Sequence, residues 1–296
     1  MKKFFYVLMA AAALVAVSCD KEGNDGNNEG ENGGDVVELA QPTHRIKTMT
    51  ASGGDVFTYS YNANGTVASV EASYDGEAYG NFVFNYEGTK LTVVNTLDSD
   101  KLALEAILDK NNHAVEVEYY YDKSEPVSLE CAYDKDGFLV SCKVNGELKT
   151  IQNIVDGNVD FWTRKGKYGE ISEDADASGW RKKLHTYYAE ENIAGIHTEW
   201  NEDVEVKRWV YETGIFGRAS VNVCKTAHWW GVNDDATQTV LDKGAEKIAY
   251  YPLNLDTTGC VGEELKLYDT VEKYESAPDT MGEDGKTTFT CEPIAK

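Results

Sequence analysis

The chain has 296 residues, with 51 acidic and 28 basic side chains and a formal net charge of −23 at pH 7. This excess of negative charge argues against nucleic acid or anionic lipid headgroups as partners, because their phosphates would be repelled. The length suffices for one or two domains with a sizeable core.

Residues 1–18 have the pattern of a lipoprotein signal peptide. Lys2 and Lys3 form a positive start, and residues 4–17 form an apolar stretch too short for a spanning helix. The following Ala16-Val17-Ser18-Cys19 resembles the lipobox of bacterial lipoproteins, in which the cysteine becomes the acylated N-terminus, although Leu usually stands where Ala16 is. The resemblance implies lipid attachment at Cys19; the alternative is an ordinary cleaved signal with a chance cysteine.

Residues 19–40 are expected to form the lipidated cysteine and a disordered acidic tether. Positions 20–35 contain Gly, Asn, Asp and Glu with one Lys and no apolar residue, so they cannot bury enough surface to fold. Acidic residues soon after a lipidated cysteine resemble the surface-export signal of some Gram-negative anaerobes. The expected location is therefore the outer membrane, lipid-anchored, on its cell-surface or periplasmic face.

Residues 41–165 are predicted to form a hairpin-repeat β region, because one four-residue turn signal recurs there. Each quartet starts with Asn or Asp, which can bond its own backbone two residues on, and ends with Gly or Asn, which readily adopt positive φ. The quartets are Asn62-Ala-Asn-Gly65, Asn85-Tyr-Glu-Gly88, Asp109-Lys-Asn-Asn112 and Asp134-Lys-Asp-Gly137, with closing residues 23, 24 and 25 positions apart.

Treating each quartet as a four-residue loop brings apolar residues opposite apolar residues, whereas a one-residue error would exchange the faces. The expected opposite pairs include Phe57 with Val70, Phe82 with Leu91, Leu104 with Val117, Cys131 with Val140, and Leu129 with Cys142. The other face carries mostly polar side chains, such as Glu71, Glu116, Glu130 and Lys143, with occasional apolar residues such as Val67. This period of two predicts one buried face and one wet face, the latter too charged for lipid.

Residues 166–296 are expected to form a second β region, continuous with the first. A charged, Gly-containing stretch at 166–183 is interpreted as a boundary or long loop. Strands are then predicted at 185–191, 196–200, 204–212, 218–224, 227–230, 247–251, 264–274 and 287–291, with further turn quartets at 192–195 and 256–259 and a short helix within 234–246.

The motif of an aromatic residue, Asn or Asp, two residues, Gly and then a strand, as in residues 61–67 and 133–140, resembles the tyrosine-aspartate repeats of Rhs-type shells. Together with the lipobox, the chain resembles hairpin-repeat lipoproteins of unknown function with a porin-like, barrel-like β fold. The similarity is clearest over residues 45–165 and fainter in Gly214-Ile-Phe-Gly217. It implies an all-β fold, an antiparallel hairpin meander curled into a barrel-like or sandwich sheet, and no chemistry.

Five cysteines remain once Cys19 is assigned to lipid, so they cannot all pair within one chain. Cys131 and Cys142 share the predicted buried face but lie diagonally in the preferred register. A two-residue turn at Asp136-Gly137 would instead place them opposite each other and allow a disulfide. The other interpretation is that the thiols are small buried hydrophobic groups.

Asp174, Asp176 and Ser178 match the first half of a calcium loop, D-x-D-x-S-G, in which alternate oxygens converge on one cation. The twelfth position would be His185 instead of a bidentate Glu, and three basic residues follow the motif at once. We therefore expect an acidic loop without metal and no cofactor, with Ca²⁺ as the alternative.

All six tryptophans lie between Trp162 and Trp230. Adjacent indoles at the end of a strand point to opposite faces, so Trp229 or Trp230 could be exposed as a platform for a sugar or a partner, with Trp200 and Trp209 as further candidates. The alternative is that all six fill the core of the C-terminal half.

Catalytic motifs are missing from the sequence: there is no G-x-S-x-G, no H-E-x-x-H and no phosphate loop. The hypothesis is a non-catalytic, lipid-anchored envelope protein that binds a glycan or a surface protein. A structural or adhesive spacer is the first alternative. A glycoside hydrolase is the second, because 51 acidic residues leave paired carboxylates open.

Overall fold

Two of the four predicted hairpin turns, at Asp109 and Asp134, are capped by their first side chain as the sequence predicts. In the turn at Asp134, the N–H groups of Asp136 and Phe138 both donate to Asp134 Oδ1 at 2.9 Å, and Gly137 closes the turn with a φ of 88°. Asp109 caps its turn in the same way, and Asn112 adopts a φ of 66°. These bonds satisfy backbone donors that no strand partner reaches.

The computed structural model describes residues 39–165, 180–198, 204–231, 245–268, Glu275 and 283–295. They belong to one unit, Leu39–Lys296, which is separate from Met1–Glu38. Cys19 and positions 234–244 of the helix predicted within 234–246 lie outside these residues, whereas positions 245 and 246 are in a strand.

The described elements are seventeen strands and one short helix. They are β1 (His44–Thr50), β2 (Asp55–Tyr61), β3 (Val67–Tyr74), β4 (Glu77–Glu87), β5 (Lys90–Asn95), β6 (Lys101–Leu108), β7 (Ala114–Tyr119), β8 (Val127–Tyr133), β9 (Leu139–Val144), β10 (Glu147–Val155), β11 (Asn158–Lys165), β12 (Trp180–Glu191), α1 (Arg208–Tyr211), β13 (Asn222–Gly231), β14 (Ala245–Tyr250), β15 (Asn254–Leu255), β16 (Val261–Tyr268) and β17 (Glu283–Pro293).

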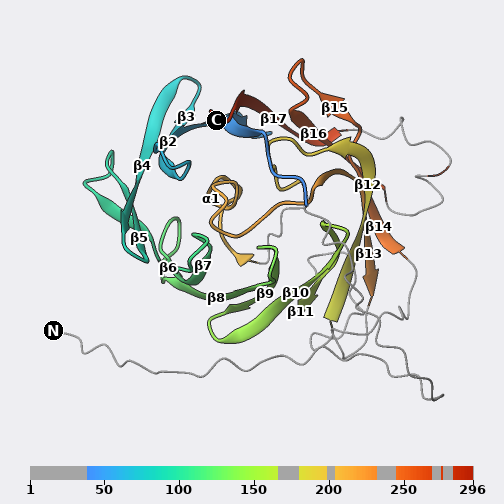
Figure 1. Ribbon diagram of the computed structural model, residues 1–296, viewed down its shortest axis with the longest axis horizontal. Coiled ribbons are helices and arrows are strands. Elements are labelled where there is room, and N and C mark those ends of the chain that lie inside the picture. Colours follow the sequence, from blue (N-terminus) through green and yellow to red (C-terminus); the bar gives the residue numbers. More distant parts are fainter. Residues whose placement is uncertain are drawn as a thin grey trace, which may run out of the picture. The chain divides into compact units, whose positions relative to one another are not determined.

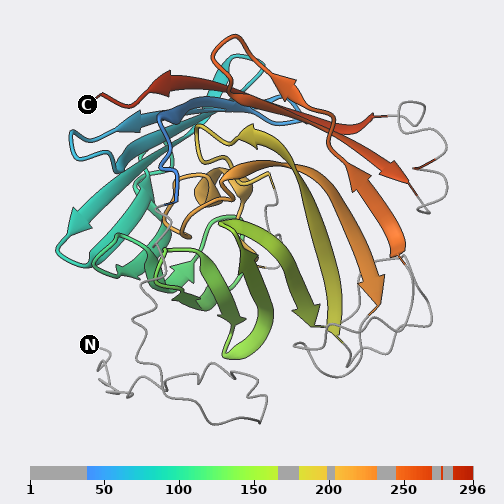
Figure 2. The same ribbon diagram turned by 45° about the vertical axis from the view of Figure 1, so that its right-hand side comes forward.

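The strands close into an antiparallel β-barrel. Apart from β15, each strand pairs with its neighbours in sequence; β14 pairs with β16, and β17 returns to pair with β1. The two-residue β15 pairs only with β16, so sixteen of the seventeen strands make the ring. Figures 1 and 2 show these strands surrounding α1. The all-β, barrel-like fold expected from the sequence is therefore confirmed.

The apolar face of β2 to β9 points into the barrel. Phe82, Leu91, Leu104 and Leu129 on this face are almost fully buried, whereas Glu116 and Glu130 on the alternate positions are exposed or half-buried. The predicted separation of a buried face and a wet face is confirmed in this half, with the wet face outside.

The exact strand register differs from the prediction, although most side chains keep the predicted face. Phe57 lies opposite Ala72 and Leu104 opposite Tyr119, each displaced by two positions. Two shifts of one position add up to this displacement. The strand ends pair one position later than predicted, as Tyr61 does with Val67, and a β-bulge beside each turn then inserts one extra residue into the strand that follows. At the first turn this inserts Ala68 and turns Val67 inward, so Val67 is 2% exposed and its assignment to the wet face was wrong.

The quartet ending at Gly88 forms a tighter turn than predicted. Glu87 pairs with Lys90, which leaves Gly88 and Thr89 as a two-residue loop and places Tyr86, not Phe82, opposite Leu91. Gly88 supplies the positive φ of 62° that this loop needs.

Residues 204–212 are not the strand that alternation suggested. They contain the one-turn helix α1, and the next strand of the barrel wall is β13. Val206, Trp209, Val210 and Tyr211 are buried inside the barrel, whereas the charged Glu205 and Lys207 are exposed. Among the described residues, no helix is long and apolar enough to cross a membrane.

Cys131 and Cys142 are buried free thiols, as the second interpretation held, although their predicted diagonal placement was wrong. Cys260 and Cys291 form a disulfide between the start of β16 and β17. Cys131 and Cys142 lie directly opposite each other, because the bulge in β9 shifts the register, and their sulfurs are 3.7 Å apart as thiols.

Because the two thiols already face each other across paired strands, a mild oxidant such as diamide should join Cys131 to Cys142 in the folded protein. We expect the number of thiols titrated after denaturation to fall by two, and a peptide linking β8 to β9 to appear in non-reducing mass spectrometry. Cys142→Ser should abolish both changes. A wild-type protein that keeps all its thiols under these conditions would contradict the expectation.

Candidate functional site

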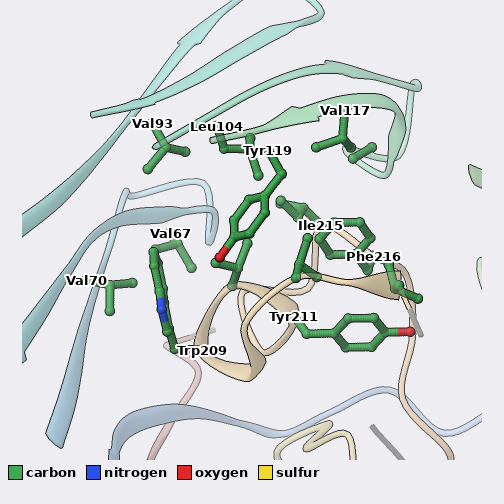
Figure 3. Packing of buried hydrophobic residues seen from close by; sticks show 14 of the residues in the cluster. Val67, Val70, Val93, Leu104, Val117, Tyr119, Trp209, Tyr211, Ile215 and Phe216 are labelled. Carbon is green, nitrogen blue, oxygen red and sulfur yellow. The ribbon is translucent and has the colours of Figure 1, made fainter. Parts of the chain in front are cut away.

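The described residues 192–198 and 204–221, which we call the plug, lie in the barrel interior. The Trp209 ring centroid lies 4.3 Å from that of Phe82 and 6.0 Å from that of Phe57, and Tyr59 Oη donates to the Trp209 carbonyl. Figure 3 shows Trp209, Tyr211, Ile215 and Phe216 of the plug among inward-pointing residues of the wall. The core of the barrel is thus completed by the plug.

The plug ends by docking on the hairpin turns. The Ala114 N–H donates to the Ile215 carbonyl at 2.7 Å, and the Arg218 N–H donates to the Gly137 carbonyl at 2.9 Å. Gly217 has a φ of 93°, and a Cβ at this position would lie 2.6 Å from the Gly137 oxygen. A glycine is required here by both conformation and space.

A buried charge cluster fastens the plug to the opposite wall. Arg208 Nε donates to Glu212 Oε1 at 3.0 Å, and its Nη1 donates to Glu263 Oε2 on β16. Arg208 Nη2 donates to the His197 carbonyl at 3.1 Å, while the His197 N–H donates to Glu212 Oε2 at 3.0 Å. One guanidinium therefore faces two carboxylates, which leaves the cluster with one negative charge in excess when both are ionised.

Burial raises the pKa of Glu212 and of Glu263 above the ordinary Glu value, and the nearby Arg208 only partly opposes this. Each folded-state pKa exceeds that of the unfolded chain. The stability from these groups is therefore fully present below the unfolded pKa and is lost as pH rises through the folded pKa.

We expect Glu263→Gln to flatten the pH dependence of stability, because one of the two proton-binding carboxyls is removed while Arg208 remains paired with Glu212. Between about pH 5 and about pH 8, the free energy of unfolding should fall less in the variant than in the wild type. Urea denaturation across this range measures the difference. Glu130→Gln on the outer wall is the control. Parallel pH profiles for Glu263→Gln and wild type would contradict the assignment.

A cavity of about 260 Å³ lies beside the plug. Residues 40–43, which we call the strap, line one of its sides, and we call the cavity the strap cavity. The remaining walls come from β1, the turn at 192–195 and the end of the plug. Three of the five histidines of the chain line it, together with two arginines: His44, His113, His197, Arg45 and Arg218.

Hydrogen bonds hold the strap in place. The Thr43 and His44 N–H groups donate to the Ile193 carbonyl at 2.9 and 3.0 Å, and Arg218 Nη2 donates to the Ala40 carbonyl at 2.7 Å. The turn at 192–195 is itself capped, because Asn192 Oδ1 accepts from the Ile196 N–H at 3.0 Å. The same turn chemistry that organises the hairpins thus shapes the cavity.

The two arginines of the cavity differ in their partners. Arg45 forms an ion pair with Glu292 at 2.7 Å and lies over the Tyr61 ring at 4.3 Å. Arg218 lies over the Phe138 ring at 5.3 Å and forms no ion pair with any described residue. The cavity therefore holds one cation whose charge is not balanced by a bonded carboxylate.

Of the candidate site residues singled out from the sequence, the described ones do not line the strap cavity. Trp209 is 3% exposed and fills the core, as the alternative interpretation held, so it is not an accessible platform. Trp229 and Trp230 lie on β13, opposite Lys183 and Lys182 of β12. Trp200, Asp174, Asp176 and Ser178 lie outside the described residues.

No group of three or more His, Cys, Asp or Glu side chains within the described ranges is arranged to hold a metal ion. The strap cavity was missed from the sequence because its lining comes from distant segments. The turn at 192–195 and the two glycines Gly214 and Gly217 were the visible signals, and both contribute to its walls.

No family model and no curated protein matches this chain. Among solved structures, it is similar to a porin-like protein from Bacteroides uniformis, with a TM-score of 0.50 and 13% identity over 85% of this chain and 99% of that chain. A porin-like protein from Bacteroides vulgatus has a TM-score of 0.46 and 9% identity over 84% of this chain and 100% of that chain. The likeness to the first establishes a shared β-barrel fold.

Proposed function

We propose that this chain is a lipid-anchored, non-catalytic binding protein of the outer-membrane envelope, and that its barrel presents a ligand cavity instead of a channel. The observation that carries the proposal is the occupied barrel interior. Trp209 and its neighbours pack against both β2 and β4, and Arg208 bonds to β16 on the far wall. A solute would have to displace an apolar core and a buried ion cluster to pass through.

The polarity of the wall supports the same proposal. A barrel embedded in lipid carries apolar side chains outside and polar ones inside. Here the outward positions of β3 to β9 include Glu71, Glu116, Glu130 and Lys143, while the inward positions are apolar. Charged groups facing the bilayer midplane cost about 2 to 4 kcal/mol each for Lys or Arg. Attachment through a lipid on Cys19 is compatible with a barrel that stays in water.

Two measurements test this proposal. The protein expressed in a Gram-negative host should incorporate radiolabelled fatty acid and fractionate with the outer membrane, and Cys19→Ser should do neither. Purified protein added to a planar bilayer should give no stepwise conductance. Conductance steps, or wild-type protein that carries no lipid, would contradict the proposal.

The ligand is proposed to be a glycan, with a surface protein or a purely structural role as the competing assignments. A glycan array probed with wild type, Trp229→Ala, Trp230→Ala and Arg218→Gln separates them. Loss of signal in a tryptophan variant places the contact on β13, and loss in Arg218→Gln places it at the strap cavity. An array silent for every protein would favour the spacer.

A further inference from the structure

We infer that the strap cavity binds a small carboxylated sugar, of the uronic acid class, with Arg218 holding the carboxylate. This inference rests on the proposed binding function and specifies its ligand. It depends on the state of one arginine, the chemistry of the surrounding wall and the size of the space.

Arg218 differs from the other arginines whose side chains the structure describes. Arg45 is bonded to Glu292, and Arg208 is bonded to Glu212 and Glu263. Arg218 has no such partner among the described residues, although the chain has 51 acidic and 28 basic side chains. Among the described residues, its guanidinium donates only through Nη2, to the Ala40 carbonyl, so the other guanidinium N–H groups remain available. A planar guanidinium with free donors is suited to a two-point contact with a carboxylate.

The acidic side chains of the cavity do not cancel this charge. Both oxygens of Glu212 are engaged, one by Arg208 and the other by the His197 N–H. Glu191 is exposed at the end of β12 and forms no ion pair with Arg218. An anion entering the cavity therefore meets the Arg218 cation without first displacing a bound carboxylate.

The remaining wall offers both polar and apolar groups. His44 uses Nδ1 toward Thr43 Oγ1, and His113 Nδ1 is buried without a hydrogen bond to any described residue, at 3.5 Å from Asp109 Oδ2. Pro42, Ile193, Val221 and Ile294 contribute apolar surface. A sugar acid matches this mixture, because its hydroxyl groups exchange hydrogen bonds while the C–H faces of its ring pack on aliphatic side chains.

The size of the cavity limits the ligand to about one sugar ring. About 260 Å³ corresponds to roughly nine waters at about 30 Å³ each. This is below the range of about 300 to 1,000 Å³ that is usual for drug-sized ligands. A longer glycan would have to place only its terminal residue beneath the strap.

Calorimetric titration of the full mature protein with D-glucuronate tests the inference, with D-glucose as the uncharged match. We expect saturable binding of glucuronate and at least about tenfold weaker binding of glucose, because a hydrogen bond to a charged group is lost. Arg218→Gln should weaken glucuronate binding by about the same factor, and Arg218→Lys should restore part of it. Lys143→Gln, which removes one positive charge from the outer wall, should leave binding unchanged.

The outcomes separate the inference from the broader proposal. Equal binding of glucose and glucuronate, or binding unaffected by Arg218→Gln in a variant whose circular dichroism matches wild type, would overturn the carboxylate assignment while leaving a glycan binder. Glucuronate that gives no heat, together with array signals from other glycans, would do the same. No binding to any glycan in either experiment would remove the proposed function itself. Competition by a short uronate oligomer would identify a chain end as the source of the ligand.

Discussion

Arg208→Ala is expected to lower the free energy of unfolding by about 3 to 5 kcal/mol. The substitution removes the cation that bonds to both Glu212 and Glu263 and leaves two carboxyls that are 0% and 8% exposed. Protonating one of them relieves part of the repulsion, but the His197 carbonyl also loses its Arg208 donor. The plug should therefore detach from β16 at lower denaturant concentration. Urea denaturation followed by tryptophan fluorescence measures the loss.

Arg45→Ala provides the matched control, because Arg45 also pairs with a glutamate but both side chains are about one-third exposed. Solvent screening limits such a pair to about 1 kcal/mol or less. Arg208→Met in a Glu212→Gln, Glu263→Gln background should recover much of the lost stability, since no buried charge then lacks a partner. Equal small losses for Arg208→Ala and Arg45→Ala would show that the buried cluster does not fasten the plug.

Trp209→Ala is also expected to cost about 3 to 5 kcal/mol, because it opens a void where the plug meets β2 and β4. The indole packs on Phe57, Phe82 and Tyr121, so its removal leaves three aromatic rings without their shared neighbour. The loss is measured by the same denaturation experiment, followed by circular dichroism since a tryptophan signal is lost.

Trp209→Phe separates packing from hydrogen bonding. The indole N–H of Trp209 is buried with no acceptor among the described residues, so replacing it by a phenyl ring sacrifices no hydrogen bond. We expect the phenylalanine variant to lose less than half of what the alanine variant loses. A phenylalanine variant as unstable as the alanine variant would indicate an unrecognised polar role for this side chain.

Local turn chemistry could be predicted from the sequence because it depends on neighbouring residues. The caps at Asp109 and Asp134 and the positive φ of Gly137 follow from residue type and spacing alone. The inward direction of Phe82 and Leu104 followed from alternation. The strand register could not be predicted in this way. A bulge such as that in β9 costs little free energy locally, and packing across the barrel determines where it forms.

The plug could not be predicted because its pattern has two explanations. Apolar and charged residues alternate over 204–206, as they would in a strand. Burial follows this alternation, because Val204 and Val206 are buried while Glu205 is exposed, yet the segment forms no strand. The partners of its charged residues come from near and far in the chain: Arg208 bonds to Glu212 one turn away and to Glu263 on a distant strand. Only the closed barrel brings that last pair together.

The strap cavity could not be predicted for the same reason, because its lining residues are brought together only by the closed barrel. The tryptophans formed the more conspicuous pattern in the sequence. Composition marks an aromatic cluster readily, but it does not distinguish Trp209 in a core from an indole at a surface. The informative residue, Arg218, is a single arginine in an acidic chain. Arg218 stands out only because Arg45 and Arg208 each bond to a carboxylate in the folded chain, which the sequence does not show.

The pairing of β1 with β17 places the two ends of the barrel side by side, and the Ile294 N–H donates to the Thr43 carbonyl at 3.0 Å. A short linker could therefore join these positions, and new termini could be opened in a surface turn such as Asn145-Gly146. Circular permutants of this kind should keep the barrel while moving its N-terminus, and with it the proposed lipid anchor, to the opposite rim. The fold thus allows the proposed anchor and the proposed ligand site to be repositioned relative to each other without altering a single side chain of the core.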